Sequence, residues 1–331
     1  VKNGNVEALS WSHSQGFGVR ALVNGAWGFA ASSLLTREEV DHVTALAVSI
    51  AQASSLVQHQ PICLDQPRRN VDRYRTPVQI DPFSVPVEQK LALLLAADAA
   101  MRQVKGIRVA KASVEAVKET KTFASTEGSL LEQEIIETGG GIDCMAVSAN
   151  EVQRRSYPNS FGRHQGTVGW EMILALDLPA HGERLATEAM QLLTAPQCPS
   201  ATTTLILGAT QLGLQVHESC GHPIELDRVF GSEAAYAGTS FLTLEKMGHF
   251  RYGSDYVNIV ADATIPGGLG TFGYDDEGVP AQRTPIIQNG GFINYLTSRD
   301  TAAQIGQASS GAARADGWAR IPMVRMTNLN L

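Results

Sequence analysis

Alternating and helix-spaced apolar positions divide the first hundred residues into strands and helices. Residues 18–23 and 26–30 have a strand pattern and flank Asn24-Gly25, a dipeptide typical of a two-residue hairpin turn. Thr36-Arg37-Glu38-Glu39 forms a capping box, which predicts a helix from there to about Ser54. The proline-containing stretch 56–83 is interpreted as an irregular connection, and a second helix is predicted to begin at Pro86.

The pattern changes to strands in the middle of the chain. From Ile107 to about Leu178, β-like runs are separated by turn residues at Glu127-Gly128, Gly139-Gly140-Gly141 and Pro158-Asn159. This spacing predicts an antiparallel meander. Residues 180–195 then return to the apolar spacing of a helix.

The last third begins with an apolar run and ends in glycine-rich sequence. Thr202–Leu207 predicts a buried strand, a short helix is expected from about Thr210 to Gly221, and the remainder is β-like. The order of elements predicts an α+β fold with two subdomains, largely antiparallel sheets, few helices and a glycine-rich β C-terminal part. We predict an N-terminal α/β and β-meander domain over residues 1–178 and a metal-binding catalytic domain over 179–331.

Composition restricts the class of partner. The chain has 331 residues, is 44% hydrophobic and 18% charged, and carries a net charge of −7 from 26 basic and 33 acidic residues. Such a chain can bury a large core, and its negative charge argues against nucleic acid or an anionic membrane as a partner. No apolar run approaches the roughly 18 residues of a membrane span. The four cysteines are too scattered for a disulfide framework, which favours a cytoplasmic location.

The two ends of the sequence suggest an interior piece of a longer protein. Val1 is followed by polar, turn-like residues and not by the charged and apolar regions of a signal peptide. The chain stops at Asn328-Leu329-Asn330-Leu331, in the middle of a strand-like pattern. We therefore expect the sequence to be trimmed at both ends.

The segment that carries chemistry is His217-Glu218-Ser219-Cys220-Gly221-His222. Two imidazoles can bind a divalent metal, and an adjacent carboxylate can take a proton from water bound to that metal, as in the helical H-E-x-x-H zinc site. Here the second histidine comes five positions after the first, so a regular helix would aim the two rings about 140° apart. The alternative is a helix end with two unrelated histidines.

Two local geometries would bring the rings together. A π-bulge would place positions i and i+5 on one face. The interpretation we favour from sequence is that the helix ends at Gly221 and that His222 folds back from the exit loop, because Pro223 disfavours α backbone at the residue before it. Glu218 would then lie beside the metal as the general base.

A catalytic zinc also needs a third protein ligand. Local candidates are Glu225, Asp227 and His249, while Cys220 is more typical of a small buried residue. Gly268-Leu269-Gly270-Thr271-Phe272-Gly273 matches G-x-G-x-x-G, but no helix is expected after it, which argues against a dinucleotide site. The sequence contains no G-x-S-x-G serine-hydrolase elbow.

The motif and several other segments resemble one family. His217–Pro223 is similar to the metal-binding signature of the TldD/PmbA, or modulator of DNA gyrase, metallopeptidases, on the TldD-like side. The resemblance extends over nearly the whole chain, through segments that match along its length: Gly18–Arg20, Gly25–Ala30, Ser125–Gly128, Asp276–Gln282 and Pro322–Asn328.

The resemblance implies a zinc-dependent peptidase that acts on short or unfolded peptides. It implies that His217 and His222 are zinc ligands, that Glu218 is the catalytic carboxylate, and that the third ligand is a Cys in a segment beyond Leu331. It also implies a heterodimer with a PmbA-like subunit, or a homodimer, that encloses the site. Two other functions stay open, namely a non-catalytic partner subunit of such a complex and a metal-dependent amidohydrolase acting on small molecules. A peptide could also add as a strand to an open sheet edge in the glycine-rich segment 253–273.

Overall fold

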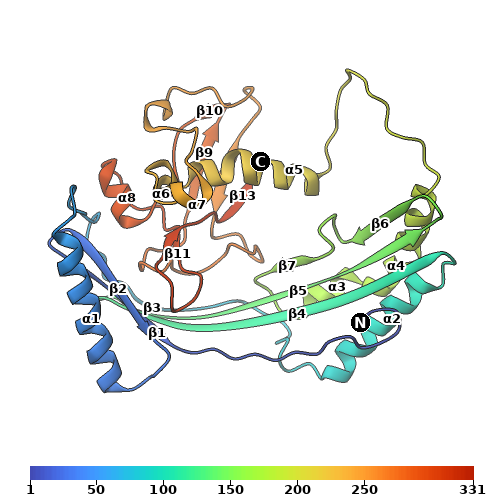
Figure 1. Cartoon of the computed structure of the whole chain (residues 1–331), viewed down its shortest axis with the longest axis horizontal. Coiled ribbons are helices and arrows are strands. Elements are labelled where there is room, and N and C mark those ends of the chain that lie inside the picture. The colour runs from blue at the N-terminus through green and yellow to red at the C-terminus, as the bar shows by residue number, and fades with distance from the viewer.

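A long antiparallel ribbon forms the central part of the molecule. The computed structural model describes all of residues 1–331. Strands β4 (Ile107–Ala124) and β5 (Leu130–Val147) each contain 18 residues and pair along almost their full length. At about 3.3 Å per residue, the ribbon is roughly 60 Å long, and Figure 1 shows it crossing the width of the molecule. The turn between the strands contains Gly128 at φ +101°, which confirms a turn at Glu127-Gly128.

Strand β5 is the centre of the five-stranded sheet built on this ribbon. β3 (Val71–Arg75) runs parallel to β5, whereas β6 (Val152–Tyr157) and β7 (His164–Gly166) pair with it antiparallel. The prediction of a turn at Gly139-Gly140-Gly141 is wrong, because all three glycines lie inside β5. They permit close packing instead, since a Cβ on Gly141 would lie 2.1 Å from the carbonyl oxygen of Gly162.

Two helices pack on one end of the ribbon. α2 (Val87–Arg102) begins directly after Pro86, as predicted, and α4 (Leu178–Leu192) lies against both α2 and β5. α3 (Glu171–Leu176) precedes α4. The core between helices and ribbon consists of fully or almost fully buried side chains, including Met101, Ala112, Ile142, Cys144, Leu178 and Leu185.

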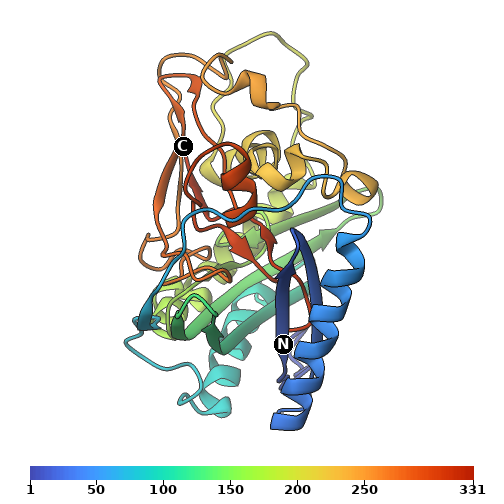
Figure 2. The ribbon, with the colours of Figure 1, turned by 90° about the vertical axis from the view of Figure 1, so that its left-hand side faces the viewer.

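The opposite end of the ribbon carries a hairpin and the longest helix. β1 (Phe17–Val23) and β2 (Ala26–Ser32) pair antiparallel around Asn24 and Gly25, whose φ angles of +48° and +76° confirm the predicted turn. α1 (Arg37–Ser55) is capped as predicted, because the Thr36 side chain accepts a hydrogen bond from the backbone N–H of Glu39. Figure 2 shows α1 lying along the hairpin.

The C-terminal part contains a second, smaller sheet. Its strands have the order β10-β9-β8-β13 and are all antiparallel: β8 (Ile259–Asp262), β9 (Arg283–Gln288), β10 (Gly291–Phe292) and β13 (Asn328–Asn330). β11 (Ala313–Arg314) pairs with β12 (Met323–Val324). The helices of this part are α5 (Ala209–Val216), α6 (Leu226–Val229), α7 (Ala234–Ala237) and α8 (Arg299–Gln304). Its core includes Ile224, Leu226, Ile259, Phe292 and Tyr295.

One predicted strand does not form. Residues 202–207 have no regular secondary structure and are almost entirely exposed, with Ile206 at 92%. The β-branched and apolar residues of this run have no neighbouring strand, and strand propensity is expressed only where a partner and a packing surface exist. This segment belongs to the long connection between α4 and α5 that Figure 1 shows rising away from the ribbon.

Ion pairs join the C-terminal part to the ribbon and the N-terminal hairpin. Lys121 on β4 lies 2.8 Å from Asp276, and Arg20 on β1 lies 2.6 Å from the buried carboxylate of Glu277. The α+β class with largely antiparallel sheets is confirmed. The boundary between residues 178 and 179 stays a prediction.

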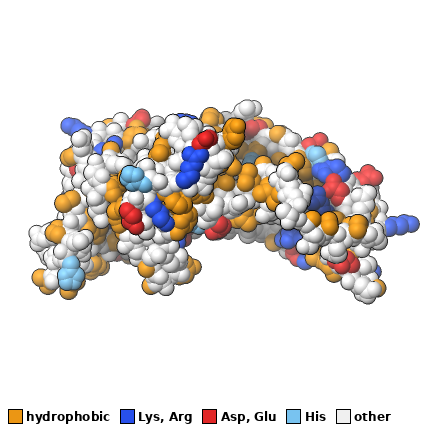
Figure 3. All heavy atoms as spheres, turned by 90° about the horizontal axis from the view of Figure 1, so that it is seen from above, with side chains coloured by type: hydrophobic (Ala, Val, Ile, Leu, Met, Phe, Trp, Pro, Cys, Tyr) orange, Lys and Arg blue, Asp and Glu red, His pale blue; other side chains and the backbone are white.

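The surface is mixed in charge. On the face seen in Figure 3, acidic and basic side chains are interspersed with hydrophobic ones, and no single basic patch is visible. None of the helices combines the length and the apolar character that crossing a membrane would require.

Candidate metal centre

The histidine motif lies on a π-helical turn that continues α5. Residues His217–Gly221 form this turn (η1), and the backbone N–H of His222 donates to the carbonyl oxygen of His217, five residues earlier. A short 3₁₀ segment (η2, His222–Ile224) follows directly, and Gly221 has right-handed helical angles. The helix therefore does not end before His222, and the exit-loop interpretation is wrong. The π-turn still brings the two imidazoles together, because it places residue i+5 on the same face of the helix as residue i.

The two imidazoles meet edge to face. Their Nε2 atoms are 3.1 Å apart, and the ring planes are at 89°. Two ligands held 2.0–2.1 Å from a tetrahedral ion would be about 3.3 Å apart, so this spacing suits a single shared zinc. Glu218 completes the group, with Oε1 3.9 Å from His217 Nε2. Ligand atoms of the three residues all lie within 4.8 Å of one another.

The three motif residues are exposed to solvent on one side, and a buried carboxylate contacts one of them on the other. The side chains of His217 and Glu218 are 47% and 64% exposed, whereas that of His222 is 32% exposed. Behind His222 lies Glu225, whose carboxylate is fully buried and has Oε2 3.0 Å from His222 Nδ1. Metal-binding histidines typically donate their second ring nitrogen to such a carboxylate. The donor set and its support therefore fit a zinc ion.

The segment before β13 is fastened to the same region. Val324 N–H donates to Asp227 Oδ2 over 2.9 Å, and Arg325 Nη1 lies 2.6 Å from Glu233 Oε1. Burial raises the pKa of Asp227 to about 6, with smaller contributions from neighbouring carboxylates and against the lowering effect of its backbone hydrogen bonds. These contacts join residues about a hundred positions apart in sequence next to the motif.

Comparisons with known proteins agree along the whole chain. Residues 1–51 match PmbA/TldA metallopeptidase domain 1, residues 80–193 match the central domain, and residues 200–331 match the C-terminal domain. A metalloprotease of Methanocaldococcus jannaschii is 32% identical over 333 residues, which cover 99% of this chain and 69% of that protein. The chain belongs to the PmbA/TldA metallopeptidase family. A metalloprotease TldD homolog of Haemophilus influenzae is 27% identical, covering 99% of this chain and 66% of the homolog.

Solved structures of this family share the fold. TldE from Thermococcus kodakarensis matches 94% of this chain with a TM-score of 0.65 at 15% identity. A Bacteroides thetaiotaomicron structure described as a modulator of DNA gyrase matches 95% with a TM-score of 0.71 at 13% identity. In both, the match covers 66% of the solved chain, so this chain spans about two thirds of the length of these relatives.

The local candidates for a third ligand do not join the metallopeptidase motif. Glu225 lies behind His222, on the side of Nδ1. Asp227 is buried, and its two oxygens accept the backbone N–H groups of Arg228 and Val324. His249 is exposed and lies outside the group formed by the motif residues. Sequence analysis named Glu225 only as a candidate ligand, and its contact with His222 has a sequence signal, because a carboxylate three residues after a histidine on a helical segment can reach it.

Cys220 lies within the π-turn but is fully buried. Burial raises the pKa of its thiol to about 12, and a hydrogen bond with Tyr252 lowers it only partly. The sulfur of Cys220 is also not among the ligand atoms that converge in the group of His217, Glu218 and His222. Cys220 is therefore a packing residue in this structure.

Alkylation should separate the four cysteines into two pairs. Cys63 and Cys198 are exposed, whereas Cys144 and Cys220 are buried, and burial raises the Cys144 pKa to about 11. We expect iodoacetamide at pH 8 to modify the exposed pair in native protein and the buried pair only after denaturation. Peptide mass spectrometry measures this pattern, and rapid native labelling of Cys220 would contradict it.

The G-x-G-x-x-G segment packs closely against residues 327–328. A Cβ on Gly268 would lie 2.6 Å from the side-chain amide of Asn328, and one on Gly270 would lie 2.8 Å from the Thr327 backbone. The glycines thus let this loop approach the strand that leads to the end of the chain. No helix follows the segment, which agrees with the argument against a dinucleotide site.

The glycine-rich stretch 253–273 does not supply an open strand edge. Its one strand, β8, pairs with β9 on one side and with β13 on the other. The outer strands of this sheet are β10 and β13, so the proposed edge for peptide addition is wrong for residues 253–273.

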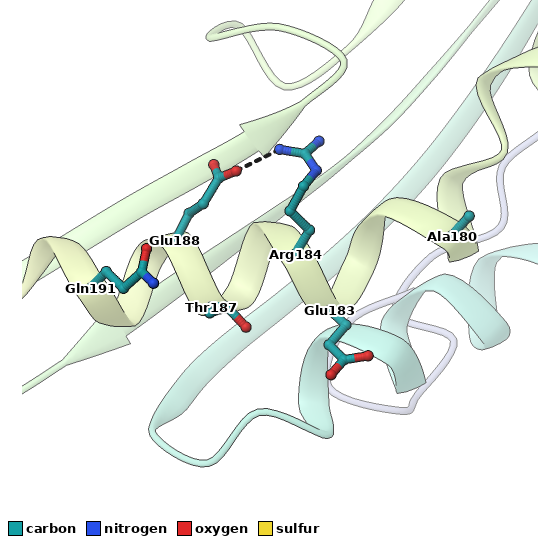
Figure 4. A pocket seen from close by; sticks show the side chains of 6 residues that line it. All are labelled: Ala180, Glu183, Arg184, Thr187, Glu188 and Gln191. Atoms are coloured by element: carbon teal, nitrogen blue, oxygen red, sulfur yellow. Dashed lines mark hydrogen bonds and ion pairs between the residues drawn. The ribbon is translucent and has the colours of Figure 1, made fainter.

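A depression elsewhere on the surface is unrelated to the motif. It has a volume of about 430 Å³ and is lined by residues of α4 alone. Figure 4 shows Arg184 and Glu188 forming an ion pair beside it, while Glu183 points away from that ion pair. It lacks apolar walls and converging ligands, so the metal group remains the candidate site.

Proposed function

We propose that this protein is a zinc-dependent peptidase that hydrolyses short or unfolded peptides. The observation that carries the proposal is the convergence of His217 Nε2 and His222 Nε2 at 3.1 Å with Glu218 beside them. A relative from Saccharolobus solfataricus named a zinc metalloprotease TldD homolog is 30% identical over 125 residues, covering 38% of this chain, and supports zinc as the metal.

Each residue of the motif has a role in this proposal. His217 and His222 hold the zinc through Nε2, and a cysteine from a segment that follows residue 331 is the proposed third ligand. Zinc, when bound, polarises the scissile carbonyl and lowers the pKa of bound water toward about 7. Glu218 accepts a proton at its carboxylate and passes it to the leaving amine.

The exposure of the site supports a partner subunit as part of the proposal. His217 and Glu218 are about half exposed in the single chain, whereas electrostatic catalysis is more effective where water is excluded. We propose that a second subunit, either a PmbA-like chain or another copy of this one, covers the site in the assembled enzyme.

Metal content and substrate preference test the function together. We expect about one zinc per full-length chain by elemental analysis, and cleavage of fluorogenic unfolded peptides that stops after chelation and returns with added zinc. The assay compares such peptides with small amides, with and without a PmbA-like subunit. Preference for small amides would indicate an amidohydrolase. If this chain bound no metal, yet its partner cleaved peptides only in its presence, this chain would be a non-catalytic subunit.

A further inference from the structure

A buried cluster of charged side chains lies directly behind His222. Glu225 is at its centre, and its side chain is fully buried. Arg228 donates to Glu225 Oε2 from Nε over 3.2 Å and from Nη2 over 3.1 Å. Glu233 Oε2 accepts from the same Nη2 of Arg228 over 3.2 Å, and Glu233 also pairs with Arg325.

The contact between His222 and Glu225 defines which ring nitrogen carries a proton. His222 Nδ1 is 3.0 Å from Glu225 Oε2. Arg228 Nη2 is also near Nδ1, at 3.4 Å, and could donate to it. A carboxylate that accepts two bonds from an arginine has no proton to give, so an unprotonated Nδ1 would place two lone pairs 3.0 Å apart. The shorter, charge-assisted contact therefore requires a proton on Nδ1.

The other oxygen of Glu225 is held by the C-terminal segment. Its Oε1 accepts the backbone N–H of Met326 over 3.3 Å. The same segment packs under the π-turn, since a Cβ on Gly221 would lie 2.0 Å from Met326 Sδ and 2.7 Å from Leu329 Cδ1. Glu225 is thus fixed from two directions and has little freedom to leave His222.

We propose that Glu225 is a positioning residue that holds His222 in the Nδ1-protonated tautomer and fixes the orientation of its ring. The lone pair of Nε2 then points to the place where His217 Nε2 also points. This inference rests on the proposed zinc site, which it deepens by assigning the residue that prepares one of its ligands. Carboxylates in this role typically affect metal affinity by about 10–100-fold.

Zinc affinity and tautomer state test the assignment in three variants. We expect Glu225→Ala to weaken Zn²⁺ binding about 10–100-fold in competition with a chromophoric chelator. Glu225→Gln keeps an oxygen that can accept from Nδ1 and should recover part of that loss. The matched control is Glu233→Gln, since Glu233 is also buried and contacts Arg228 but not His222. This control should leave zinc affinity unchanged.

Nitrogen NMR of the metal-free protein labelled at histidine provides a second measurement. The His222 signals are assigned by their loss in His222→Asn. We expect a protonated Nδ1 and a bare Nε2 in the wild type and in Glu233→Gln, and a mixture of tautomers in Glu225→Ala. An unchanged tautomer in Glu225→Ala, or equal weakening of zinc in Glu233→Gln, would overturn the proposal.

The two measurements separate the inference from the function on which it rests. If the full-length wild type bound no zinc, the zinc peptidase would be excluded, while the tautomer of metal-free His222 would still decide whether Glu225 controls it. If zinc bound with equal affinity in the wild type and in Glu225→Ala, the zinc site would stand and the positioning role would fail. Thermal unfolding of each metal-free variant checks that the fold is retained.

Discussion

Replacing Glu218 by Gln is expected to lower kcat/KM for peptide hydrolysis by about 10²–10⁴-fold while zinc stays bound. The amide keeps the size and the exposure of the side chain but cannot accept a proton from water. His217 and His222 are unchanged, so their two Nε2 atoms still converge at 3.1 Å. The loss should therefore appear in turnover and leave metal content alone.

Steady-state kinetics on a fluorogenic unfolded peptide, paired with elemental analysis of the same sample, measures this prediction. Glu183→Gln is the matched control, because Glu183 is an exposed glutamate on α4 outside the motif. It should cleave at the wild-type rate. Peptidase activity retained in Glu218→Gln with normal zinc would remove Glu218 from the role of base.

Replacing Arg299 by Met should destabilise the protein by about 3–5 kcal/mol, because it removes one of the two guanidinium groups that pair with the buried carboxylate of Asp65. Arg299 is 7% exposed and lies 2.8 Å from both Asp65, which is 2% exposed, and Glu127. It also donates to the backbone carbonyl of Gln66. One guanidinium thus joins α8 to the loop after α1 and to the turn of the central ribbon.

The destabilisation caused by Arg299→Met should become smaller at low pH. Burial alone would raise the pKa of Asp65, but hydrogen bonds from Arg299, Ser309 and Arg68 outweigh it and hold that pKa below its ordinary value of 3.8. The stabilisation is therefore present above pH 3.8 and is lost as the pH falls through the lower folded value. Without Arg299, the pKa of Asp65 should be higher than in the wild type, with Ser309 and Arg68 still lowering it. The difference in the free energy of unfolding between variant and wild type should therefore shrink as the pH falls from 3.8 through that lower folded pKa.

Urea unfolding at several pH values measures the free energy of unfolding for both proteins. Arg283→Met is the control. The side chain of Arg283 is 62% exposed, and its Nε lies as far as 3.9 Å from Asp262 Oδ2, so this ion pair is long and exposed. Exposed pairs of this kind contribute about 0–1 kcal/mol. An equal decrease in the free energy of unfolding in the two variants would show that the buried ion pairs of Arg299 stabilise the protein no more than an exposed pair does.

Local signals in the sequence predicted local structure well. Asn24-Gly25 specifies its turn through backbone angles that few other residues adopt, and Thr36 specifies a helix start through a hydrogen bond three residues away. The motif predicted that His217 and His222 converge, but by way of an exit loop, whereas a π-turn brings them together. The resemblance to the TldD/PmbA family predicted the fold that the comparisons confirm.

Features that depend on distant partners could not be predicted in this way. Residues 202–207 have the composition of a buried strand, but a strand needs a neighbour that composition does not supply. The glycines at 139–141 look like a turn, and only the approach of Gly162 explains why they lie inside a strand. The choice of a π-turn over an exit loop depends on packing against Met326 and Leu329, more than a hundred residues later.

The dependence of the metal centre on the C-terminal segment has a consequence during synthesis on the ribosome. Asp227, Glu225 and Glu233 receive their contacts from Val324, Met326 and Arg325, which lie 97, 101 and 92 residues further along the chain. At about 5–20 residues per second, that distance corresponds to roughly 5–20 s of translation. During this interval the nascent chain carries both histidines but not the contacts that complete their support. A candidate metal centre built in this order acquires its complete set of supporting contacts only after almost all of the described chain has been made.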